Sequence, residues 1–551
     1  MKLNGARILI EELIRQGVDT VFGYPGGAVL NIYDELYKCS DRIDHVISAH
    51  EQGACHAADG YARASGKTGV VIATSGPGAT NLVTGIANAN LDSVPLVAIT
   101  GNVSMQALGR DSFQEVDIVG ITQPIVKHNF MVRDVTELEQ TIQEAFLIAN
   151  AGRKGPVLID IPKNVQTGEC EYGIAVVPRM PEKAKLTYHR DKVLEAIRTA
   201  ERPFIYCGGG VLAADAGEEL LELSRRLDAP VGLSMMGRTA LSDSYEYNLG
   251  LCGMHGNYAA SKAQAECDLL IAVGVRFSDR ATGDPEEYRS KCTVIHIDID
   301  KAELGKNIRP DLSVQGDVKE ILRDLLRDLS GVRHPAWREA IEEYKQTVVP
   351  DRPGEFYPKS IIETVRRHTE DDTVVATDVG QHQMWTVQYY HFEKPHTLLT
   401  SGGLGTMGYG LGAAIGGCIG SGRRRTVLFT SEGSFGMNLN ELCTVVSQEL
   451  PILIILLNNN VLGMVRQWQG IFYGERYSQT TLDRKTDFPA LARAFGLPGY
   501  RVETLSELER VLTEIDGAGG PALLDCHIDM DEKVLPMIPP GQSIKSIILK
   551  G

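Results

Sequence analysis

The fold is decided by residues 426–460, which read TVLFTSEGSFGMNLNELCTVVSQELPILIILLNNN. An apolar run of strand length, Thr426–Thr430, leads into Ser431-Glu432-Gly433-Ser434. A helical stretch follows, and a second apolar run, Ile452–Leu457, ends in three asparagines. Because apolar runs alternate here with a helical period, the segment predicts two parallel strands joined by a helix.

The two predicted strand ends carry side chains that suit one divalent ion. Glu432 follows the first strand and Asn459 follows the second. Ligands of a parallel sheet gather outside the carboxyl ends of its strands. Gly433 lets a diphosphate approach the backbone, and Mg²⁺ bridges diphosphate oxygens to a few protein oxygens. Two ordinary strand-to-helix turns would give the same pattern, so this block alone leaves both interpretations open.

Composition excludes several classes of protein. The chain has 551 residues and a net charge of −16, which argues against a nucleic-acid binder and a basic membrane patch. Its ten cysteines include no CxxC pair, which is typical of reduced thiols in the cytosol. No apolar run approaches ~18 residues, and a helical pattern without a signal or transit peptide begins near Met1. We therefore expect a cytoplasmic protein without a membrane span.

Apolar runs of strand length alternate with helical periods along the whole chain, which predicts three α/β blocks with doubly wound parallel sheets. The predicted domains are residues 1–165, 189–330 and 355–530, with a linker at 166–188 and a C-terminal tail at 531–551. Val71–Gly78 resembles Val427–Ser434 in having a strand, Thr-Ser and a turn with glycine. This echo suggests two related domains, with chance similarity as the alternative.

A second candidate site surrounds Glu51, which opens a helical stretch among small apolar residues. A lone glutamate is more often a surface residue or a helix cap. Here, glycine-rich turns after apolar strands lie on both sides of it in the sequence, at Gly23–Ala28 and Thr74–Asn81. Turns of this kind pass close to ligands, so Glu51 is a candidate for ligand chemistry.

These motifs together resemble the thiamine-diphosphate-dependent enzymes, and closely the catalytic large subunits of acetohydroxyacid synthase, also called acetolactate synthase. The resemblance runs nearly end to end and is strongest at Gly23–Ala28, His50–Arg63, Thr74–Asn81, Phe113–Glu115, Gly380–Trp385, Ser401–Gly410 and Leu462–Trp468. It implies a pyrimidine-binding domain, a central FAD-binding domain and a diphosphate- and Mg²⁺-binding domain. It also implies a homodimer or homotetramer with active sites between subunits, and a possible small regulatory subunit.

The resemblance assigns cofactor roles to particular residues. Glu51 would hydrogen-bond the pyrimidine ring of thiamine diphosphate, and Met407 would wedge the cofactor into its bent shape beside the carbonyl of Gly405. The implied catalytic residues are Glu51, Gly27 and Gln114. The implied contacts of thiamine diphosphate are Glu51, Gln381, His382, Gly405, Met407, Gly433, Ser434, Asn459 and Met464, and those of Mg²⁺ are Glu432, Asn459 and the main-chain oxygen of Val461.

The central block has strand-end glycines, acids and an arginine, which suit a nucleotide with a diphosphate and a ribose. The resemblance implies structural FAD, held by Arg153, Gly209, Gly210, Met254, His255, Gly274, Arg276, Asp298 and Asp317. The implied substrate funnel is lined by Phe113, Lys127, Met464 and Trp468. Residues 403–408 also fit GxGxxG, but no suitable acidic residue follows a next strand, so a dinucleotide fold there is rejected.

The implied reaction decarboxylates pyruvate and condenses the hydroxyethyl unit with pyruvate or 2-ketobutyrate, giving 2-acetolactate or 2-aceto-2-hydroxybutyrate for branched-chain amino acid synthesis. One departure touches the active site: Ser431-Glu432 stands where the family has Gly-Asp. Compared with aspartate, glutamate has one more methylene and reaches about 1.5 Å further. Mg²⁺ tolerates little distortion of its octahedral coordination, so the affinity for the metal or the choice of ion could change. The alternatives are a cofactor-binding paralogue with weak or no catalysis, or another thiamine-dependent 2-keto acid carboligase or decarboxylase.

Overall fold

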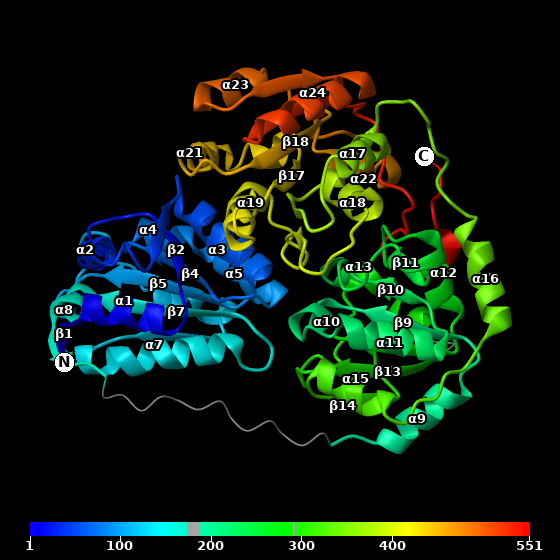
Figure 1. Cartoon of the computed structure of the whole chain (residues 1–551), viewed down its shortest axis with the longest axis horizontal. Helices are drawn as coiled ribbons and strands as arrows, with labels where there is room; N and C mark the ends of the chain where they lie inside the picture. Colours follow the sequence, from blue (N-terminus) through cyan, green and yellow to red (C-terminus); the bar gives the residue numbers. More distant parts are fainter. Residues whose placement is uncertain (174–186, 290–291, 551) are drawn as a thin grey trace.

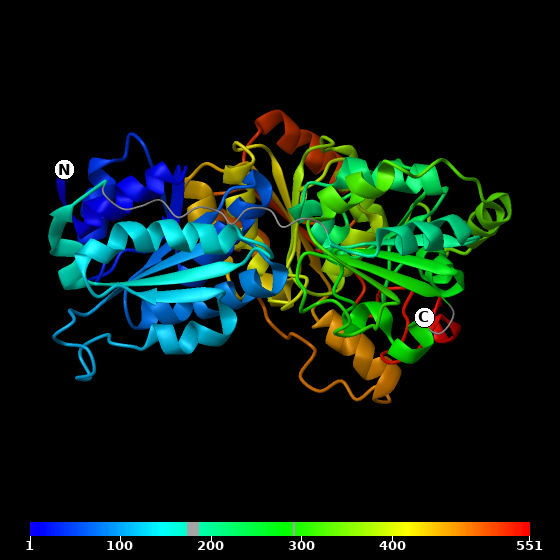
Figure 2. The same cartoon turned by 90° about the horizontal axis from the view of Figure 1, so that it is seen from below.

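The computed structural model describes residues 1–173, 187–289 and 292–550, and within them lie three six-stranded parallel sheets, each flanked by helices. Figure 1 shows the three sheets as three bodies, and Figure 2 shows them from below. The predicted fold class is therefore confirmed. None of the helices in the described part of the chain combines the length and the apolar character needed to cross a membrane.

The first and third sheets have the same strand order. The first runs β3-β2-β4-β5-β7-β6, with β2 Thr20–Gly23, β3 Asp44–Ile47, β4 Gly69–Ala73, β5 Leu96–Asn102, β6 His128–Met131 and β7 Pro156–Pro162. The third runs β16-β15-β17-β18-β20-β19, with β15 Val374–Thr377, β16 Leu398–Leu399, β17 Thr426–Thr430, β18 Ile452–Asn458, β19 Gly499–Val502 and β20 Ala522–His527. The two segments that echo each other in sequence begin on β4 and β17, which are the third strands of their sheets. The shared order supports the interpretation that these domains are related.

The central sheet has a different order, β11-β10-β9-β12-β13-β14. Its strands are β9 Pro203–Cys207, β10 Val231–Leu233, β11 Asn248–Leu251, β12 Leu269–Val273, β13 Thr293–Asp298 and β14 Leu312–Gln315. From β9 the chain adds β10 and β11 on one side, and it then returns to add β12, β13 and β14 on the other side. Sheets with this order bind dinucleotides at the point where the strand order reverses. That point in this chain lies between β9 and β12.

Helices cover both faces of each sheet. In the first domain they are α1 Gly5–Arg15, α2 Leu30–Lys38, α3 Glu51–Ser65, α4 Pro77–Asn81, α5 Val83–Asp92, α6 Ile118–Thr122, α7 Val135–Asn150 and α8 Lys163–Thr167. In the central domain they are α9 Arg190–Thr199, α10 Gly209–Ala213, α11 Gly217–Leu227, α12 Tyr258–Glu266, α13 Asp279–Thr282, α14 Pro285–Arg289 and α15 Val318–Leu326, and α16 Pro335–Lys345 follows. In the third they are α17 Pro358–Arg367, α18 Gln381–Tyr389, α19 Tyr409–Gly420, α20 Glu432–Phe435, α21 Leu442–Ser447, α22 Gly463–Phe472, α23 Phe488–Phe495 and α24 Leu505–Ala518.

The start of the chain and the start of the predicted linker are paired with each other. The strand β1 (Lys2–Asn4) lies antiparallel to β8 (Glu169–Glu171). The side chain of Asn4 then caps α1 by accepting a hydrogen bond from the N–H of Arg7 (2.7 Å). The predicted linker, 166–188, is thus helix or strand over most of residues 166–171, and its part at 174–186 lies outside the described residues.

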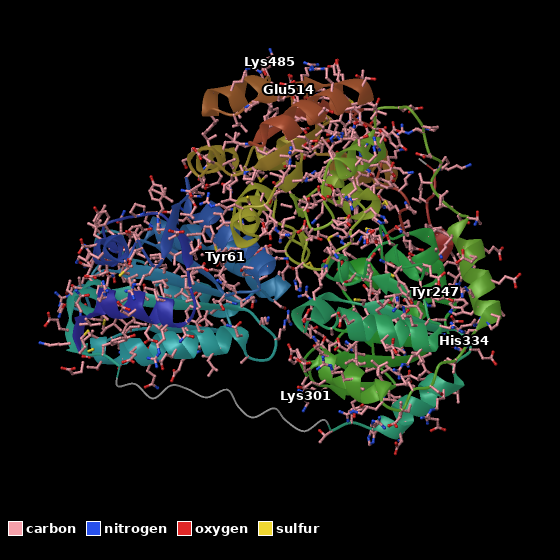
Figure 3. The ribbon with its side chains drawn as sticks, viewed as in Figure 1. Tyr61, Tyr247, Lys301, His334, Lys485 and Glu514 are labelled. Carbon is pink, nitrogen blue, oxygen red and sulfur yellow. The ribbon has the colours of Figure 1, made fainter. Side chains whose placement is uncertain are left out.

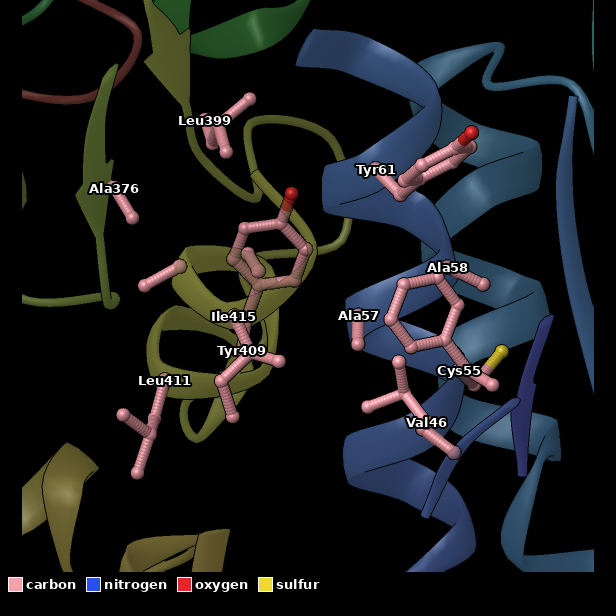
Figure 4. Packing of buried hydrophobic residues seen from close by; sticks show 14 of the residues in the cluster. Val46, Cys55, Ala57, Ala58, Tyr61, Ala376, Leu399, Tyr409, Leu411 and Ile415 are labelled. Carbon is pink, nitrogen blue, oxygen red and sulfur yellow. The ribbon is translucent and has the colours of Figure 1, made fainter. Parts of the chain in front are cut away.

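Helices α3 and α19 join the first and third domains (Figure 1). They meet over small residues: a Cβ on Gly412 would lie 2.8 Å from the carbonyl oxygen of Gly53. Figure 4 shows Ala57 on the side of α3 nearer to α19, the helix that carries Tyr409 and Ile415. All of these side chains are buried in one core cluster, which spans both domains. The first and third domains therefore share one continuous hydrophobic core.

The C-terminal tail runs between the central and third domains. The carbonyl oxygens of Glu532 and Val534 accept hydrogen bonds from Gln381 (2.7 Å) and Gln467 (3.1 Å) of the third domain. The N–H of Ile538 donates to the carbonyl of Met254 in the central domain (2.8 Å). The tail thus contacts both of the regions in which cofactor residues are predicted.

Candidate active site

The third sheet brings the predicted diphosphate and metal residues to one point. Its strand order reverses between β15 and β17, where ligands of such sheets bind. Gln381 and His382 open α18 just after β15, and Glu432 opens α20 just after β17. Asn459 follows β18, the next strand of the sheet.

Glu432 has an unusual environment. Its side chain is buried, with 3% exposure, and neither carboxylate oxygen has a hydrogen-bond partner among the described residues. Burial raises the pKa of Glu432 to about 7, against the opposing effect of nearby backbone N–H groups. A buried carboxylate without a partner is costly, and a bound cation would compensate for that cost. The residue therefore fits a metal ligand.

The neighbouring oxygens suit the same ion. The described residues hold no group of three or more His, Cys, Asp or Glu side chains that could bind a metal. A cation here would be held by one carboxylate together with amide, main-chain and ligand oxygens, which is the way Mg²⁺ binds with phosphates. The amide of Asn459 donates to Gln381 Oε1 (3.2 Å), and its Oδ1 accepts from the N–H of Val461 (3.3 Å). These contacts fix the amide beside the site.

His382 lies at the start of α18 and Ser434 in α20, both just after strands of the third sheet, and their contacts with a diphosphate stay predictions. Burial lowers the pKa of His382 to about 3, so its imidazole is neutral, and its buried Nε2 has no partner among the described residues. Ser434 Oγ donates to the carbonyl of Val379 (2.7 Å). A Cβ on Gly433 would meet Leu462 at 2.9 Å and the methyl carbon of Met407 at 3.8 Å. Met407 therefore lies next to the turn that carries Glu432, the predicted metal ligand.

Asp378 stabilises the end of the loop that carries Gly405 and Met407. This buried carboxylate accepts hydrogen bonds from the N–H of Gly408 (2.8 Å) and of Val379 (3.0 Å). Burial raises the pKa of Asp378 to about 6. Gly405 (φ 69°) and Gly408 (φ 88°) both adopt the left-handed conformation that glycine permits. Sequence reasoning missed Asp378, because one buried acid after a strand carries no pattern of its own.

The three predicted catalytic residues all lie in the first domain, where Glu51 and Gln114 both contact the turn after β4. Glu51 is largely buried, and its carboxylate accepts a hydrogen bond from Asn81 (2.9 Å). A Cβ on Gly78 would lie 3.2 Å from that carboxylate, so the turn after β4 passes directly beside it. Gln114 (φ 59°) packs against Gly76 of the same turn. Gly27 lies in the turn after β2, and a Cβ there would meet no atom within 4 Å.

The start of α3 is fixed by a residue of the third domain. The buried carboxylate of Glu441 accepts hydrogen bonds from the N–H groups of Ala49 (3.1 Å) and His50 (3.0 Å), the two residues before Glu51. Thr444 donates to its other oxygen (2.7 Å). Glu441 thus positions Glu51 across a domain boundary, and sequence reasoning missed it because the contact spans nearly 400 residues.

The central domain places most of the predicted FAD residues near its own switch point. Gly209 and Gly210 open α10 after β9, and a Cβ on Gly210 would lie 2.6 Å from Cα of Gly274, which follows β12. Asp298 ends β13; it is buried, and burial raises its pKa to about 6. Arg153 reaches from the first domain to Glu303 Oε1 (2.7 Å). A cradle of glycines with flanking charges fits a dinucleotide diphosphate.

Two further predicted FAD residues, Arg276 and Asp317, have protein partners, whereas His255 has an unpartnered ring nitrogen among the described residues. Arg276 donates to the carbonyl of Leu91, and burial lowers its pKa. Burial lowers the pKa of His255 to about 4, and its Nδ1 is buried without a partner among the described residues. Asp317 caps α15 by accepting from the N–H of Glu320 (3.1 Å). Capping of α15 is a sufficient role for the Asp317 carboxylate, with no ligand needed.

The predicted substrate residues lie in three places. Met464 and Trp468 are one turn apart on α22, where the guanidinium carbon of Arg280 lies 5.1 Å from the Trp468 ring centroid. Phe113 is 88% exposed. Lys127 donates to the carbonyls of Ile148 and Ala151 (2.7 Å) at the end of α7. No interaction among the described residues joins Phe113 or Lys127 to α22, so these assignments stay predictions.

Each of the three domains matches a known protein family. Three family models match: the N-terminal TPP binding domain of thiamine pyrophosphate enzymes over residues 3–121, the central domain over 190–325 and the C-terminal TPP binding domain over 378–526. Fold and site thus define a thiamine pyrophosphate enzyme.

Curated relatives narrow the class. The chain is 44% identical to the acetolactate synthase isozyme 2 large subunit of Escherichia coli (strain K12), over 100% of both chains. It is 43% identical to a probable acetolactate synthase large subunit of Methanocaldococcus jannaschii and to an acetolactate synthase large subunit of Porphyra purpurea, each over 99% of this chain and 95% of the relative. The chain belongs to the family of acetolactate synthase large subunits.

Proposed function

We propose that the chain is the catalytic large subunit of an acetolactate synthase. It releases CO₂ from pyruvate and joins the remaining two-carbon unit to a second 2-keto acid. Pyruvate as acceptor gives 2-acetolactate, and 2-ketobutyrate gives 2-aceto-2-hydroxybutyrate, both for branched-chain amino acid synthesis. The observation that carries this proposal is Glu432, a buried carboxylate without a partner among the described residues, at the switch point of a thiamine pyrophosphate enzyme sheet.

Thiamine diphosphate and Mg²⁺ would be held in the third domain. Glu432, Asn459 and the main-chain oxygen of Val461 would bind the metal, and His382 Nε2 and Gln381 would contact the diphosphate. Nε2 of His382 is buried and has no partner among the described residues, and it would donate to a phosphate oxygen in the tautomer that carries the proton on Nε2. When bound, the cofactor supplies the nucleophilic carbon that attacks pyruvate and accepts the electrons released with CO₂.

Glu51 would hold and move the proton that activates the cofactor. Its carboxyl group would hydrogen-bond a ring nitrogen of the pyrimidine, and Asn81 holds its other side (2.9 Å). Met407 and the carbonyl of Gly405 would orient the same ring. Low exposure around Glu51 keeps water away from the exchanged proton, which favours general acid–base transfer.

The central domain would hold FAD at the point between β9 and β12. Gly210 and Gly274 let the turns after β9 and β12 pack against each other at this point. Backbone N–H groups of Gly209 and Gly210 at the start of α10 would face the diphosphate, and Arg153, Arg276 and Asp298 would supply charged contacts around it. The Trp468 side chain on α22 would contact the extra methylene of 2-ketobutyrate, an apolar contact worth about 1–3 kcal/mol. Phe113, Lys127 and Met464 complete the proposed substrate funnel.

The finer organisation is proposed with the activity. The domain boundaries would be 1–165, 189–330 and 355–530, with 531–551 as the tail. Active sites would form between two subunits of a homodimer or homotetramer in the cytoplasm, with a small regulatory subunit as a further partner. Exposed apolar side chains beside the predicted site support a subunit contact there, including Phe113 (88%) and Met437 (60%).

The test is acetolactate formation by the purified chain. Pyruvate is supplied with thiamine diphosphate, Mg²⁺ and FAD, with and without a small subunit, and acetolactate is measured after acid conversion to acetoin. We expect product only when cofactor and metal are both present. No acetolactate under any of these conditions, including Mn²⁺ in place of Mg²⁺, would contradict the proposal.

A further inference from the structure

One buried carboxylate of the first domain holds a loop of the third. Asp92 lies at the end of α5, and its side chain is fully shielded from solvent. Its two oxygens accept hydrogen bonds from the N–H groups of Gly402 (3.1 Å) and Gly403 (2.7 Å). Gly402 and Gly403 precede Gly405 by three and two residues, and all three glycines lie in an exposed loop.

Arg63 completes this contact from α3. It donates to Asp92 (2.9 Å) and to the carbonyl of Thr400 (3.0 Å). Its Nε donates to Asp59 (2.7 Å), so one arginine is shared by two carboxylates with no exposure to solvent. Breaking a buried and fully paired arrangement of this kind leaves an uncompensated charge, which makes the geometry stiff.

The same network reaches both ends of the loop. Asp59 accepts from the Tyr409 hydroxyl (2.7 Å), just after the loop, and from the amide of Asn88 (3.2 Å). Asn88 in turn accepts from the hydroxyl of Ser401, just before the glycines. The loop is therefore attached to α3 and α5 on both sides of Gly405 and Met407.

We propose that Asp92 is a positioning residue that sets where Gly405 and Met407 stand, and hence how the cofactor pyrimidine is oriented. This inference rests on the proposed function, because it takes Gly405 and Met407 as cofactor contacts. A carboxylate suits the role because it accepts from two consecutive N–H groups and from Arg63 at once. A Cβ on Gly403 would lie 2.8 Å from Asp92, so the glycine makes this close approach possible.

The test compares Asp92→Asn with a matched control in the full-length protein. Asparagine keeps the shape but turns an NH₂ group toward an N–H or the guanidinium. The control is Asp268→Asn, because Asp268 also accepts from two consecutive backbone N–H groups, those of Glu201 (2.8 Å) and Arg202 (2.9 Å), in the central domain. Asp92→Glu, which keeps the charge, serves as the conservative variant.

Two readouts are needed. Hydrogen–deuterium exchange of the peptide covering residues 400–408 is followed without ligands, and kcat and KM for pyruvate are measured at saturating cofactors. For Asp92→Asn we expect amide exchange at 402–403 to be at least tenfold faster, kcat at least tenfold lower and the pyruvate KM within threefold of wild type. Asp92→Glu should regain part of kcat, and Asp268→Asn should match wild type in both readouts.

Three results with an active wild type would overturn the inference. Unchanged amide exchange in Asp92→Asn would mean that Asp92 does not hold the loop. Faster exchange with a kcat within threefold of wild type would mean that the held loop does not orient the cofactor, and faster exchange across the whole first domain would make the role a purely structural one. Wild-type protein without activity would instead refute the proposed function, which the amide exchange data alone would not do.

Discussion

Gly416 of α19 lies directly against the carbonyl oxygen of Ala57 of α3, with no room between them for a side chain. Any Cβ on Gly416 would overlap with that oxygen, which is backbone and cannot rotate away. Gly60 of α3 meets the backbone of Ala413 in the same way. Small residues let two helices approach closely, and here they join the domain of Glu51 to the domain of Met407.

Gly416→Ala should therefore destabilise the protein although alanine favours helices. Overpacking a close contact costs about 1–3 kcal/mol, and the backbone on the other side leaves little relief. Urea unfolding would measure the loss. Gly517→Ala on α24 is the control, because a Cβ there meets nothing within 4 Å, and alanine should stabilise that helix by up to about 1 kcal/mol. Equal effects of the two substitutions would contradict the packing account.

His368 links α17 to α24 in a pH-dependent way. Its Nδ1 lies 2.7 Å from Asp516 and its Nε2 2.8 Å from Glu509, so both nitrogens must carry protons. Burial acts to lower the pKa of His368, but the two carboxylates outweigh it and raise the pKa above its ordinary value. Glu514 of the same helix α24 is labelled near the outer edge of the third domain in Figure 3.

A raised histidine pKa stabilises the folded state below the unfolded pKa of about 6.5, and the stabilisation is lost as pH rises through the folded pKa. The difference in Tm between wild type and His368→Gln should be largest near pH 6 and should vanish at alkaline pH. The exposed His189 supplies the control substitution His189→Gln. A Tm difference that grows as pH rises would contradict the assigned ion pairs.

Glu432→Gln tests the metal assignment. The substitution keeps the shape but removes the charge that the buried, unpartnered oxygens would offer to Mg²⁺. We expect the Mg²⁺ concentration needed for half-maximal cofactor binding, read from tryptophan fluorescence, to rise at least tenfold, because one carboxylate is the main protein charge in such sites. Glu219→Gln is the control, since Glu219 is also buried with one oxygen unpaired among the described residues. An unchanged Mg²⁺ dependence would remove Glu432 from the metal site.

Much of the fold was predictable because long apolar runs carry it. The predicted strand at Thr426–Thr430 has the bounds of β17, the one at Ile452–Leu457 ends one residue before β18 does, and the class of three parallel sheets is confirmed. Lys2–Asn4 and Glu169–Glu171 were not predicted as strands, because each is three residues long and pairs with a segment far along the chain. Pairing at that distance leaves no local pattern.

The candidate site was predictable only where it lies in motifs. Glu51, Glu432 and Asn459 stand in glycine-rich or strand-end segments, and the structure places Glu432 and Asn459 together at one switch point. Asp92 and Glu441 could not be predicted, because each acts on backbone N–H groups more than 300 residues away. A side chain that binds backbone imposes no sequence requirement on its partner beyond a small residue, such as Gly403.

The most direct test of the central claim is the rate of hydrogen–deuterium exchange at C2 of the bound thiamine diphosphate, followed by NMR after acid quenching. Glu51→Gln keeps the hydrogen bond to Asn81 sterically possible but cannot transfer a proton. With equal cofactor occupancy in both proteins, the wild type should exchange within the turnover time, and Glu51→Gln should be slower by at least about 100-fold. An exchange rate in Glu51→Gln within threefold of the wild-type rate would contradict the assignment of Glu51, and with it the account of how this chain activates its cofactor.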